Sequence, residues 1–375
     1  MDHAVNNHAS PIIAVLTEIT LSESNEPTFG RVHGFCEELC KLVIDSGGLF
    51  YVFSLKDFTI DGIFGFHFEG GSWKKSKLPF PDVIYNRIPS RKTERGKRYS
   101  AFLELSKKLD IKVFNHRFLT KWEVHEWLSH KKNLQPFLPD TCLYSKKSLR
   151  KMLTLYPEVF IKPLSGSQGR GIIRIITQKD QLLVSFSSQP EAGPSGALDI
   201  EDLISLVQKK VGNQLYLIQQ GIPLLGIEDR VIDIRVLCHR GTNEKWKVTS
   251  AVGRLSAENH FTANLARGGE IISPLKILNA YFNRKAGIQK LRLLKELALE
   301  AADCISENAP GLIAELGIDI GVDVDGNLWV IEANSKPSKN FEQEASKIRP
   351  SAKAIIAYCH SLFSRQSGAE GGDEE

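Results

Sequence analysis

The sequence predicts an α/β protein of two domains, the first built on a parallel sheet and the second on antiparallel strands. Apolar runs suited to strands alternate with helix-like segments up to about residue 118. Beyond that point the glycine-rich segment 165–171 joins two apolar runs, and Asp325-Gly326-Asn327 joins another two. Strand–helix–strand repeats form parallel sheets, whereas tight turns between strands form hairpins. Both architectures are therefore expected in one chain.

The first domain is expected to span residues 1–118. Short apolar runs bounded by turn residues predict its strands, and apolar residues at helical spacing predict its helices. Gly47-Gly48 ends the first helix, because glycine is favoured just past a helix C-terminus. The predicted strands are 11–16, 49–54, 82–86 and 111–115, and the predicted helices are 31–46 and 97–109.

The second domain is expected to span residues 119–365. Asp199 is a suitable N-cap for a helix ending near 211. The other predicted helices are 120–130 and 288–307, and the predicted strands are 159–164, 172–176, 214–220, 229–238, 245–255, 317–324 and 328–334. Residues 366–375, rich in Glu, Asp, Gly and Ser, are predicted to be a disordered acidic tail.

Composition excludes several classes of protein. The 375 residues are 42% hydrophobic and 25% charged, which is typical of a globular chain. A net charge of +4 argues against a nucleic-acid partner. No apolar run approaches the ~18 residues of a membrane span, the polar N-terminus lacks a signal sequence, and the six cysteines form no disulfide or zinc pattern. A cytoplasmic protein without a membrane partner is expected.

The glycine-rich segment 165–171 is a candidate phosphate-binding loop. It follows Lys162 closely, and glycines allow backbone N–H groups to approach phosphate oxygens. The segment has no Gly-Lys-Ser/Thr ending, so it is not a Walker A loop. A glycine-rich hairpin turn without a ligand is the alternative.

Asp319, Glu332 and Asn334 form a candidate metal site. Glu332 and Asn334 lie two residues apart and therefore on one face of a strand. The predicted hairpin brings Asp319 level with them. Three oxygen ligands of this kind suit Mg²⁺. The alternative is a polar outer face, but the apolar run 328–331 predicts a buried strand.

Residues 87–98 hold a basic cluster in which Glu94 is the only acid; its members are Arg87, Arg91, Lys92, Arg95, Lys97 and Arg98. It follows a predicted parallel strand, at the sheet edge where α/β domains bind ligands. The two interpretations are a binding site for an anionic substrate or polymer, with Arg87 as its main functional residue, and the solvated start of a helix.

These motifs resemble the ATP-grasp superfamily, which includes D-alanine–D-alanine ligase and glutathione synthetase. The interval from Asp319 to Glu332 and the ending Glu332-Ala333-Asn334-Ser335-Lys336-Pro337 are specific to it. Tyr85-Asn86-Arg87-Ile88-Pro89, Asp233-Ile234-Arg235 and the segment 264–269 look like the YheC/YheD-like group, named for endospore coat-associated proteins. The resemblance implies an N-terminal pre-ATP-grasp domain followed by a two-lobed ATP-grasp domain.

The resemblance also implies a nucleotide site with Mg²⁺, or Mn²⁺ in its place, on Asp319, Glu332 and Asn334. Lys162 and Lys121 match lysines that contact ATP phosphates. Segment 219–222 matches the hinge whose backbone reads adenine, and Asp233 matches a ribose-binding acid. The residues implied to bind the cofactor ATP are Lys121, Lys162, Gly166, Ser167, Gln168, Gly169, Gly171, Gln219, Gln220, Gly221, Ile222, Asp233 and Asn264.

The resemblance implies that basic residues lie near the reacting groups. Peptide ligases often carry Arg two positions before the metal-binding Asp, but this chain has Gly317 there. Charge stabilisation then comes from other basic residues. The implied catalytic residues are Arg254, Arg267 and Lys162, and the implied substrate residues are Arg87, Arg235, Arg267, Ser335 and Lys336.

The implied function is an ATP- and Mg²⁺-dependent ligase that joins a carboxylate to an amine through an acyl-phosphate, acting on small-molecule or peptide substrates. The rival is a non-catalytic ATP-binding component of the spore coat, with coat proteins as partners and a spore-coat or forespore location. A third interpretation, an anionic-polymer module using residues 87–98, fits the small net charge poorly.

Overall fold

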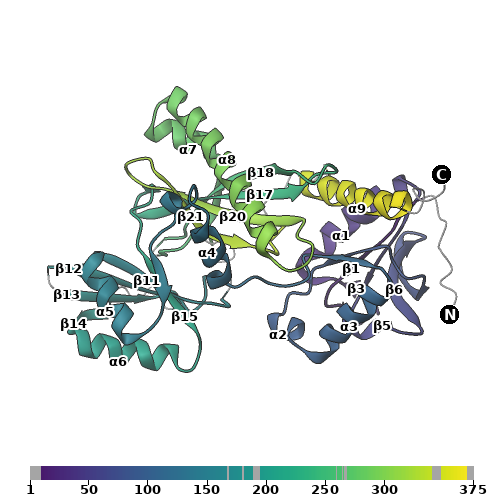
Figure 1. Cartoon of the computed structure of the whole chain (residues 1–375), viewed down its shortest axis with the longest axis horizontal. Coiled ribbons are helices and arrows are strands. Elements are labelled where there is room, and N and C mark those ends of the chain that lie inside the picture. The colour runs from purple at the N-terminus through teal and green to yellow at the C-terminus, as the bar shows by residue number, and fades with distance from the viewer. Residues whose placement is uncertain are drawn as a thin grey trace.

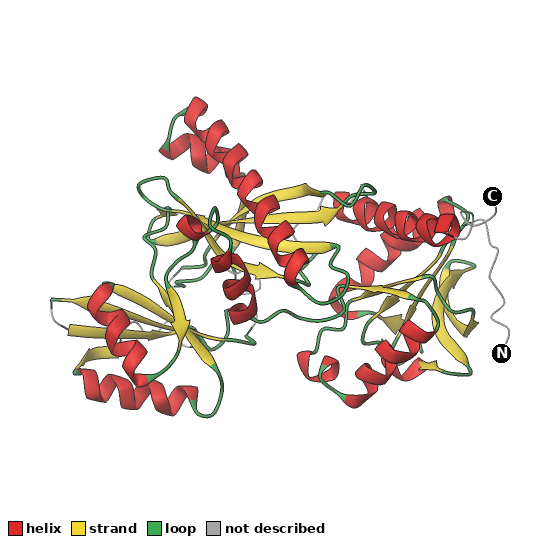
Figure 2. Cartoon of the chain, in the orientation of Figure 1, coloured by secondary structure: helices red, strands yellow, loops and turns green. Residues whose placement is uncertain are grey.

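The structure, a computed structural model, describes residues 10–166, 169–179, 181–188, 195–258, 260–263, 265, 268–339 and 348–369. Three sheets divide the described chain into an N-terminal domain and two lobes that follow it (Figure 1). Figure 2 shows that helices cover each of these sheets.

The N-terminal sheet has a parallel centre in the order β4-β1-β8-β9. Its strands are β1 (Ile12–Leu16), β4 (Leu49–Phe53), β5 (Phe58–Thr59), β6 (Gly62–Glu69), β7 (Ser72–Leu78), β8 (Val83–Asn86) and β9 (Lys112–Phe114). Beside it lie η1 (Gly30–Val32), η2 (Leu55–Asp57) and the small pair β2 (Thr20–Leu21) and β3 (Pro27–Thr28). The antiparallel strands β5–β7 extend the sheet beyond β4.

Helices bury both faces of this sheet. One side chain of β1, Ile13, packs with helix α1 (His33–Asp45) and helix α9 (Pro350–Ala369). The next side chain, Ala14, packs in a second cluster with helix α3 (Lys97–Lys108). A strand covered on both faces is a continuous apolar run rather than an alternating one, which explains the sequence of β1. The short helix α2 (Arg91–Glu94) precedes α3.

The first lobe is an antiparallel sheet in the order β10-β15-β11-β12-β13-β14. Its strands are β10 (Thr141–Leu143), β11 (Glu158–Pro163), β12 (Ile173–Gln178), β13 (Gln181–Phe186), β14 (Ser195–Leu198) and β15 (Tyr216–Gln220). Helices α5 (Lys146–Leu155) and α6 (Ile200–Val211) cover it. The Asp199 carboxylate caps α6 by accepting hydrogen bonds from the N–H groups of Glu201 and Asp202 at 2.9 and 2.8 Å.

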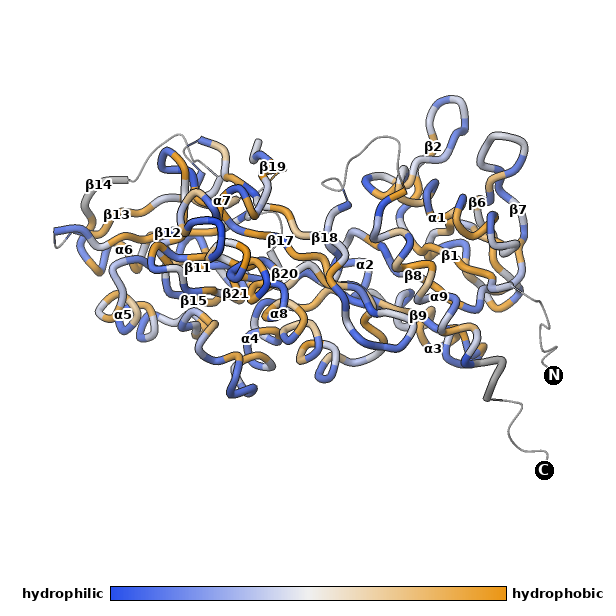
Figure 3. Tube along the Cα trace, turned by 90° about the horizontal axis from the view of Figure 1, so that it is seen from above, coloured by the Kyte–Doolittle hydropathy of each residue, from blue (hydrophilic) through white to orange (hydrophobic). Residues whose placement is uncertain are grey.

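The second lobe is built on the order β19-β18-β17-β20-β21, with β16 paired to β17. Its strands are β16 (Gly226–Ile227), β17 (Arg230–Arg240), β18 (Trp246–Leu255), β19 (Glu270–Ile272), β20 (Glu315–Val322) and β21 (Leu328–Asn334). Its helices are α4 (Lys121–His130), α7 (Pro274–Tyr281), α8 (Arg284–Asn308) and the one-turn η3 (Gln135–Phe137). Figure 3 shows the hydrophobic residues gathered in interior strands and the hydrophilic ones at turns.

Most elements predicted from the sequence are confirmed, including the two antiparallel hairpins and the capped helix α6. The elements that the sequence did not predict are mainly β5–β7, β13, β14, α5, α7 and α9. Helix α9 continues past residue 365 to Ala369 and packs against α1, so the chain returns to the N-terminal domain at its end. The remainder of the predicted tail, 370–375, lies outside the described residues.

All six cysteines are free thiols, and five of them are buried. Burial raises the pKa of the Cys40 thiol to about 11, so this thiol stays protonated at neutral pH. Within the described part of the chain, no helix is long and apolar enough to cross a membrane.

Candidate active site

A cleft of about 1390 Å³ lies where the N-terminal domain and the two lobes meet. It exceeds the ~300–1,000 Å³ of most small-molecule pockets. Many of the residues singled out in the sequence line it: Arg87, Lys121, Lys162, Gly169, Gln219, Gln220, Ile222, Asp233, Arg235, Arg254, Asp319, Glu332, Asn334, Ser335 and Lys336.

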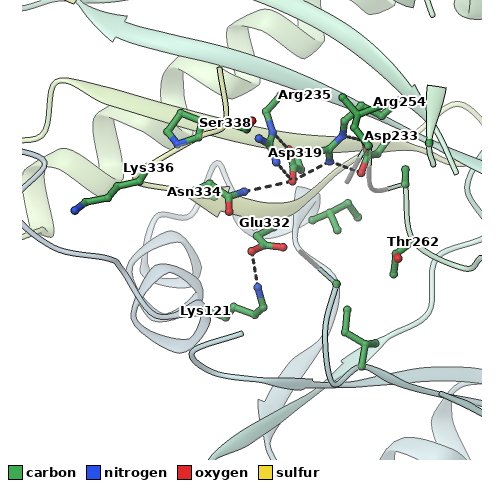
Figure 4. A pocket seen from close by; sticks show the side chains of 18 of the residues that line it. Lys121, Asp233, Arg235, Arg254, Thr262, Asp319, Glu332, Asn334, Lys336 and Ser338 are labelled. Atoms are coloured by element: carbon green, nitrogen blue, oxygen red, sulfur yellow. Dashed lines mark hydrogen bonds and ion pairs between the residues drawn. The ribbon is translucent and has the colours of Figure 1, made fainter. Parts of the chain in front are cut away.

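The predicted metal ligands converge on one side of this cleft. Asp319 on β20 is the register partner of Glu332 on β21, and Asn334 follows on the same strand. The Asn334 amide donates to Asp319 Oδ2 at 3.4 Å. Figure 4 shows the three side chains gathered at the centre of the site. The Asp325-Gly326-Asn327 turn joins the two strands, and a register shift between Asp319 and Ile320 brings Asp319 opposite Glu332. The Asp323 carboxylate accepts the Asn327 N–H at 2.7 Å to hold the turn.

Asp319 is neutralised by two arginines from neighbouring strands. Arg235 on β17 donates two hydrogen bonds to its carboxylate, one of them at 2.8 Å from Nη2 to Oδ2. Arg254 on β18 lies 3.0 Å from Asp319 Oδ2 and also binds both oxygens of Asp233 at 2.6 Å. Burial by itself raises the pKa of Asp319, but the two guanidinium groups outweigh it and hold that pKa below its ordinary value.

Glu332 has a different cation partner, Lys121 (Figure 4). Lys121 opens helix α4, whose start is fixed by a capping box in which the Thr120 hydroxyl accepts the Glu123 N–H and Glu123 accepts the Thr120 N–H. The Lys121 N–H also donates to the Leu164 carbonyl at 3.1 Å, which ties this helix to the end of β11.

Lys162 on β11 faces the same cleft from the first lobe. Its ammonium donates to Gln219 Oε1 at 2.5 Å and lies 5.4 Å from the centroid of the Phe160 ring. Burial, with a further contribution from the nearby Lys121 charge, lowers the pKa of Lys162 to about 8. A lysine with this pKa is charged at neutral pH and loses its charge under mildly alkaline conditions.

This pKa predicts a pH dependence of phosphate binding. If the charged Lys162 ammonium contacts phosphate, the affinity for Mg-ATP is expected to fall about tenfold per pH unit above about pH 8. Titration calorimetry from pH 7 to 9.5 measures this. Lys162→Gln should bind more weakly and show a flat profile over that range. The same slope in wild type and Lys162→Gln would assign the titration to another group.

The predicted hinge, residues 219–222, connects β15 to the second lobe. The N–H of Gln220 donates to the Asp140 carbonyl and that of Gly221 to the Glu158 carbonyl, both at 2.8 Å. A Cβ on Gly221 would lie 2.4 Å from Glu158 Cγ, so only glycine fits this approach. Because two hinge amides are already bonded, the adenine contacts predicted for this segment would have to use its other backbone groups.

The glycine-rich segment joins β11 and β12 as a hairpin, as predicted. Gly169 and Gly171 have positive φ angles of 65° and 72°, which favour glycine. A Cβ on Gly166 would meet Pro163 Cγ at 2.4 Å. Four predicted site residues, Ser167, Gln168, Asn264 and Arg267, lie outside the described residues.

Comparisons with known proteins decide the family. The sequence model for the YheC/D-like ATP-grasp family matches residues 110–362, more than half of the chain. The chain belongs to this family. Two relatives from Bacillus subtilis (strain 168) agree. The endospore coat-associated protein YheD is 30% identical over 354 residues, covering 91% of this chain and 75% of YheD. The endospore coat-associated protein YheC is 24% identical, with 80% and 84% covered.

Solved structures confirm the ATP-grasp fold. D-cycloserine synthetase DcsG superposes with a TM-score of 0.54 at 12% identity, covering 93% of this chain and 99% of that one. The VanG D-Ala:D-Ser ligase from Enterococcus faecalis gives 0.52 at 12% identity, with 96% and 99% covered. The predicted N-terminal α/β domain followed by an ATP-grasp region is therefore the fold class of this family member.

Whether the cleft can hold Mg²⁺ depends on the donor atoms that line it. No group of three His, Cys, Asp or Glu side chains suited to a metal occurs among the residues that the structure describes. The predicted set instead has two carboxylates and one amide oxygen, converging from two paired strands. Hard oxygen donors in this small number suit Mg²⁺, which usually keeps several waters and phosphate ligands. The donor atoms fit the ion, but Lys121 has to leave Glu332, and both oxygens of Asp319 are bonded by Arg235 and Arg254.

Three residues predicted to contact substrate serve as contacts between the domain and the lobes. The Ser335 hydroxyl donates to the Arg117 carbonyl at 3.1 Å. Lys336 is buried, pairs with Glu94 and extends away from Asp319 (Figure 4). Arg87 lies 3.2 Å from the buried Glu315 and donates to the Pro337 carbonyl at 2.9 Å. Their roles toward a substrate stay predictions.

Sequence reasoning did not identify Glu94 and Glu315 as partners of those residues. Both are isolated acids in sequence, and their cation partners come from distant parts of the chain. A third missed pair is Glu158 with Arg174, which lines the cleft from β11 and β12. Of these acids, only Glu94 carries a signal in the sequence, because it is a single acid among basic residues.

Proposed function

We propose that this YheC/D-like protein is an ATP- and Mg²⁺-dependent ligase that joins a carboxylate to an amine. The observation that carries the proposal is the convergence of the predicted metal set and two lysines in one cleft between two antiparallel sheets. Lys162 comes from the first lobe, whereas Glu332 and Lys121 come from the second. Charges that meet between two lobes can hold a polyphosphate from both sides.

The proposed reaction has two steps. A carboxylate oxygen of the acid attacks the γ-phosphorus of ATP, ADP leaves, and an acyl-phosphate forms. The amine nitrogen then attacks the acyl carbon, phosphate leaves, and the nitrogen loses its proton. Asp319, Glu332 and Asn334 would hold Mg²⁺, which when bound neutralises charge on the phosphate oxygens.

The chain's own cations have defined roles in this proposal. Lys162 and Lys121 orient the phosphates, and Arg254 faces the group being transferred. Preorganised positive groups of this kind stabilise the charge that develops in the transition state. Arg235 holds the Asp319 carboxylate in place. Arg267, the other arginine assigned to the reacting groups, lies outside the described residues.

The proposed substrates are small-molecule or peptide acids and amines. Support comes from the similarity of fold to the VanG D-Ala:D-Ser ligase, which is named for joining two amino acids. The cleft is also larger than most small-molecule pockets, which leaves room for substrates beside the nucleotide.

A second candidate function is a non-catalytic ATP-binding component of the spore coat, with coat proteins as partners. Two observations favour it. Both Bacillus subtilis relatives are named as endospore coat-associated proteins. In addition, Asp319 and Glu332 are already neutralised by Arg235, Arg254 and Lys121, so the site is electrostatically balanced without a metal.

Release of ADP separates the two candidates. Purified protein with Mg-ATP is offered a panel of amino acids, peptides and cell-wall fragments as acids and amines, and Mn²⁺ replaces Mg²⁺ in a parallel series. ADP formation that depends on one acid supports the ligase. Tight ATP binding without turnover across the panel supports the structural component.

Mg-ATP is expected to stabilise the protein against heat, because the cleft binds it only in the folded state. At a nucleotide concentration of 100 times Kd the gain is about 2.7 kcal/mol. Differential scanning fluorimetry with Mg-ATP, ATP with EDTA, and Mg²⁺ alone measures the shift. An unchanged melting temperature at millimolar Mg-ATP contradicts both candidate functions, since each requires nucleotide binding.

A further inference from the structure

The basic cluster at residues 87–98 has a structural explanation that neither sequence interpretation foresaw. Helix α2 lies on the side of the N-terminal domain that faces the lobes (Figure 1). The Ser90 hydroxyl caps this helix by accepting the Thr93 N–H at 3.1 Å. Arg91, Glu94 and Arg95 then contact other parts of the chain, whereas Lys92 is exposed, and its side chain makes no hydrogen bond or ion pair within the described part of the chain.

Glu94 is the buried centre of these contacts, with a side chain only 4% exposed. Its Oε1 accepts from the Asn86 amide at 3.0 Å and from the Lys336 ammonium. Its Oε2 accepts from the backbone N–H of Phe118 at 2.8 Å. One carboxylate thus joins the end of β8, the segment between β9 and α4, and the residues that follow β21.

Arg91 holds the segment between β9 and α4 at Leu119, one residue after the Phe118 N–H that Glu94 binds. Its Nη1 donates to the Leu119 carbonyl at 3.0 Å, and its guanidinium lies 4.5 Å from the centroid of the Phe118 ring. From the opposite side, the Ser335 hydroxyl accepts the Leu119 N–H at 3.2 Å. The two peptide groups that flank Leu119, just before Thr120, are therefore fixed by Arg91 and Ser335.

The fixed segment leads directly to Lys121, whose ammonium pairs with Glu332 and whose N–H is bonded to Leu164. Arg95 contacts the chain just after β11, because its Nη2 donates to the Ser165 hydroxyl at 2.9 Å. Helix α2 and its C-cap residue Arg95 thus contact both the segment that presents Lys121 and the chain just beyond Lys162.

We propose that helix α2 is a positioning element for the nucleotide cleft, in which Arg91 and Glu94 set the place of Lys121 opposite Glu332. The proposal rests on the proposed function, because it assigns these residues to the site where nucleotide binds. The cations Arg91 and Arg95 are directed at a backbone carbonyl, an aromatic ring and a hydroxyl of the chain itself, rather than left for an anionic polymer. Arg91 and Glu94 act through Lys121 and are positioning residues.

A double-mutant cycle tests this inference. The Kd of Mg-ATP is measured calorimetrically for wild type, Arg91→Gln, Lys121→Met and the double variant. Arg91→Gln should weaken binding about 5–10-fold, the scale of one lost hydrogen bond, whereas the control Lys92→Gln should change it less than about twofold. In the Lys121→Met background the Arg91→Gln effect should fall below about twofold, because the residues act as one unit.

Two outcomes of the cycle overturn the proposal. Equal affinities for Arg91→Gln and Lys92→Gln mean that α2 does not affect the site. A full Arg91→Gln effect that persists with Lys121→Met means that Arg91 touches the ligand directly.

Glu94 is tested in a form that leaves no buried charge without a partner. Glu94→Leu combined with Lys336→Met replaces an ion pair by apolar groups, a change that folded proteins often tolerate. With a melting temperature near wild type, this variant should bind Mg-ATP about tenfold more weakly, because the Phe118 N–H is no longer held. Wild-type affinity would overturn the role of Glu94. The Arg91 cycle concerns a half-buried side chain and decides the question if this variant does not fold.

A nucleotide-free measurement separates failure of this inference from failure of the proposed function. Hydrogen exchange of the Phe118 and Leu119 amides reports local opening of the segment. Arg91→Gln should accelerate it at least about fivefold relative to Lys92→Gln. Faster exchange in a protein that does not bind Mg-ATP would support the fixing of this segment by Arg91 and refute the nucleotide site. Unchanged exchange would refute the fixing of the segment by Arg91.

Discussion

Glu332→Gln is expected to lower ADP formation from Mg-ATP by at least ~10²-fold, the effect of losing one preorganised electrostatic group. Glu332 is one of only two carboxylates in the predicted metal set, and glutamine keeps its size while removing its charge. Metal affinity should fall, and the γ-phosphate should lose its alignment. Nucleotide should still bind, more weakly, through Lys162 and the hinge.

The fold should survive this substitution. The Glu332 side chain is 32% exposed, and the side chain of its one ion-pair partner in the described chain, Lys121, is 14% exposed. Surface ion pairs contribute about 0–1 kcal/mol, and water reaches the Glu332 end of this pair. The free energy of unfolding without ligand should therefore change by no more than about 1 kcal/mol, which separates the effect on chemistry from an effect on folding.

The measurement pairs the apo melting temperature with ADP formation for wild type, Glu332→Gln and a control. Glu296→Gln is a suitable control, because Glu296 forms an exposed ion pair with Arg292 on α8. Turnover equal to wild type would show that Glu332 is not a metal ligand. Unfolding of the unliganded variant would show instead that Glu332 is a structural acid.

The local part of the fold could be predicted because hydrophobic periodicity is a local property. The run 12–16 is apolar throughout and is a strand buried on both faces. The hairpin that contains Asp319 and Glu332 could also be predicted, since the Asp325-Gly326-Asn327 turn joins its strands. Its exact pairing could not, because a register shift between Asp319 and Ile320 puts Asp319 opposite Glu332. A few neighbouring residues decide the strand and the turn, whereas the register shift depends on how the two strands pair.

The electrostatics of the site depends on strand order, which no local pattern encodes. Arg235 stands directly opposite Asp319 because β17 pairs with β20, and Arg254 stands opposite Asp233 because β18 pairs with β17. A β17–β20 pairing joins residues far apart in sequence. The sequence therefore identified the acids and the arginines of the cleft but not their pairing with each other.

Helix α9 illustrates a second limit. Its apolar residues pack against α1 and the N-terminal sheet, although almost the whole chain separates α9 from α1. Helix α9 belongs to the N-terminal core because the chain returns to that domain after the second lobe. A domain boundary drawn from the sequence alone does not reveal this return. Tyr358 of α9 makes an edge contact with Phe114 of β9 at a centroid distance of 5.7 Å.

Asp319→Asn is expected to cost about 3–5 kcal/mol of folding free energy, because it leaves buried arginine charge without its partner. The Asp319 side chain is 6% exposed and lies between Arg235 and Arg254. Arg254 retains Asp233, whereas Arg235 loses its carboxylate. Urea unfolding of the unliganded protein measures the loss, and Glu332→Gln provides the contrast, since its ion pair is much more exposed. A loss below about 1 kcal/mol would mean that the arginines find other partners or reach water.

Asp319→Asn should also change how the free energy of unfolding falls at low pH, the acid limb of the stability profile. The pKa of Asp319 is lowered in the folded state, so the unfolded chain takes up its proton first as the pH falls. Its stabilisation is therefore present above the ordinary value of 3.8 and is lost as the pH drops through the folded-state pKa. Wild-type stability should fall steeply below about pH 4, and Asp319→Asn, which starts lower, should fall less steeply there. Parallel acid limbs in the two proteins would show that the arginines do not favour the charged form of Asp319, and the cause assigned to its lowered pKa would then be wrong.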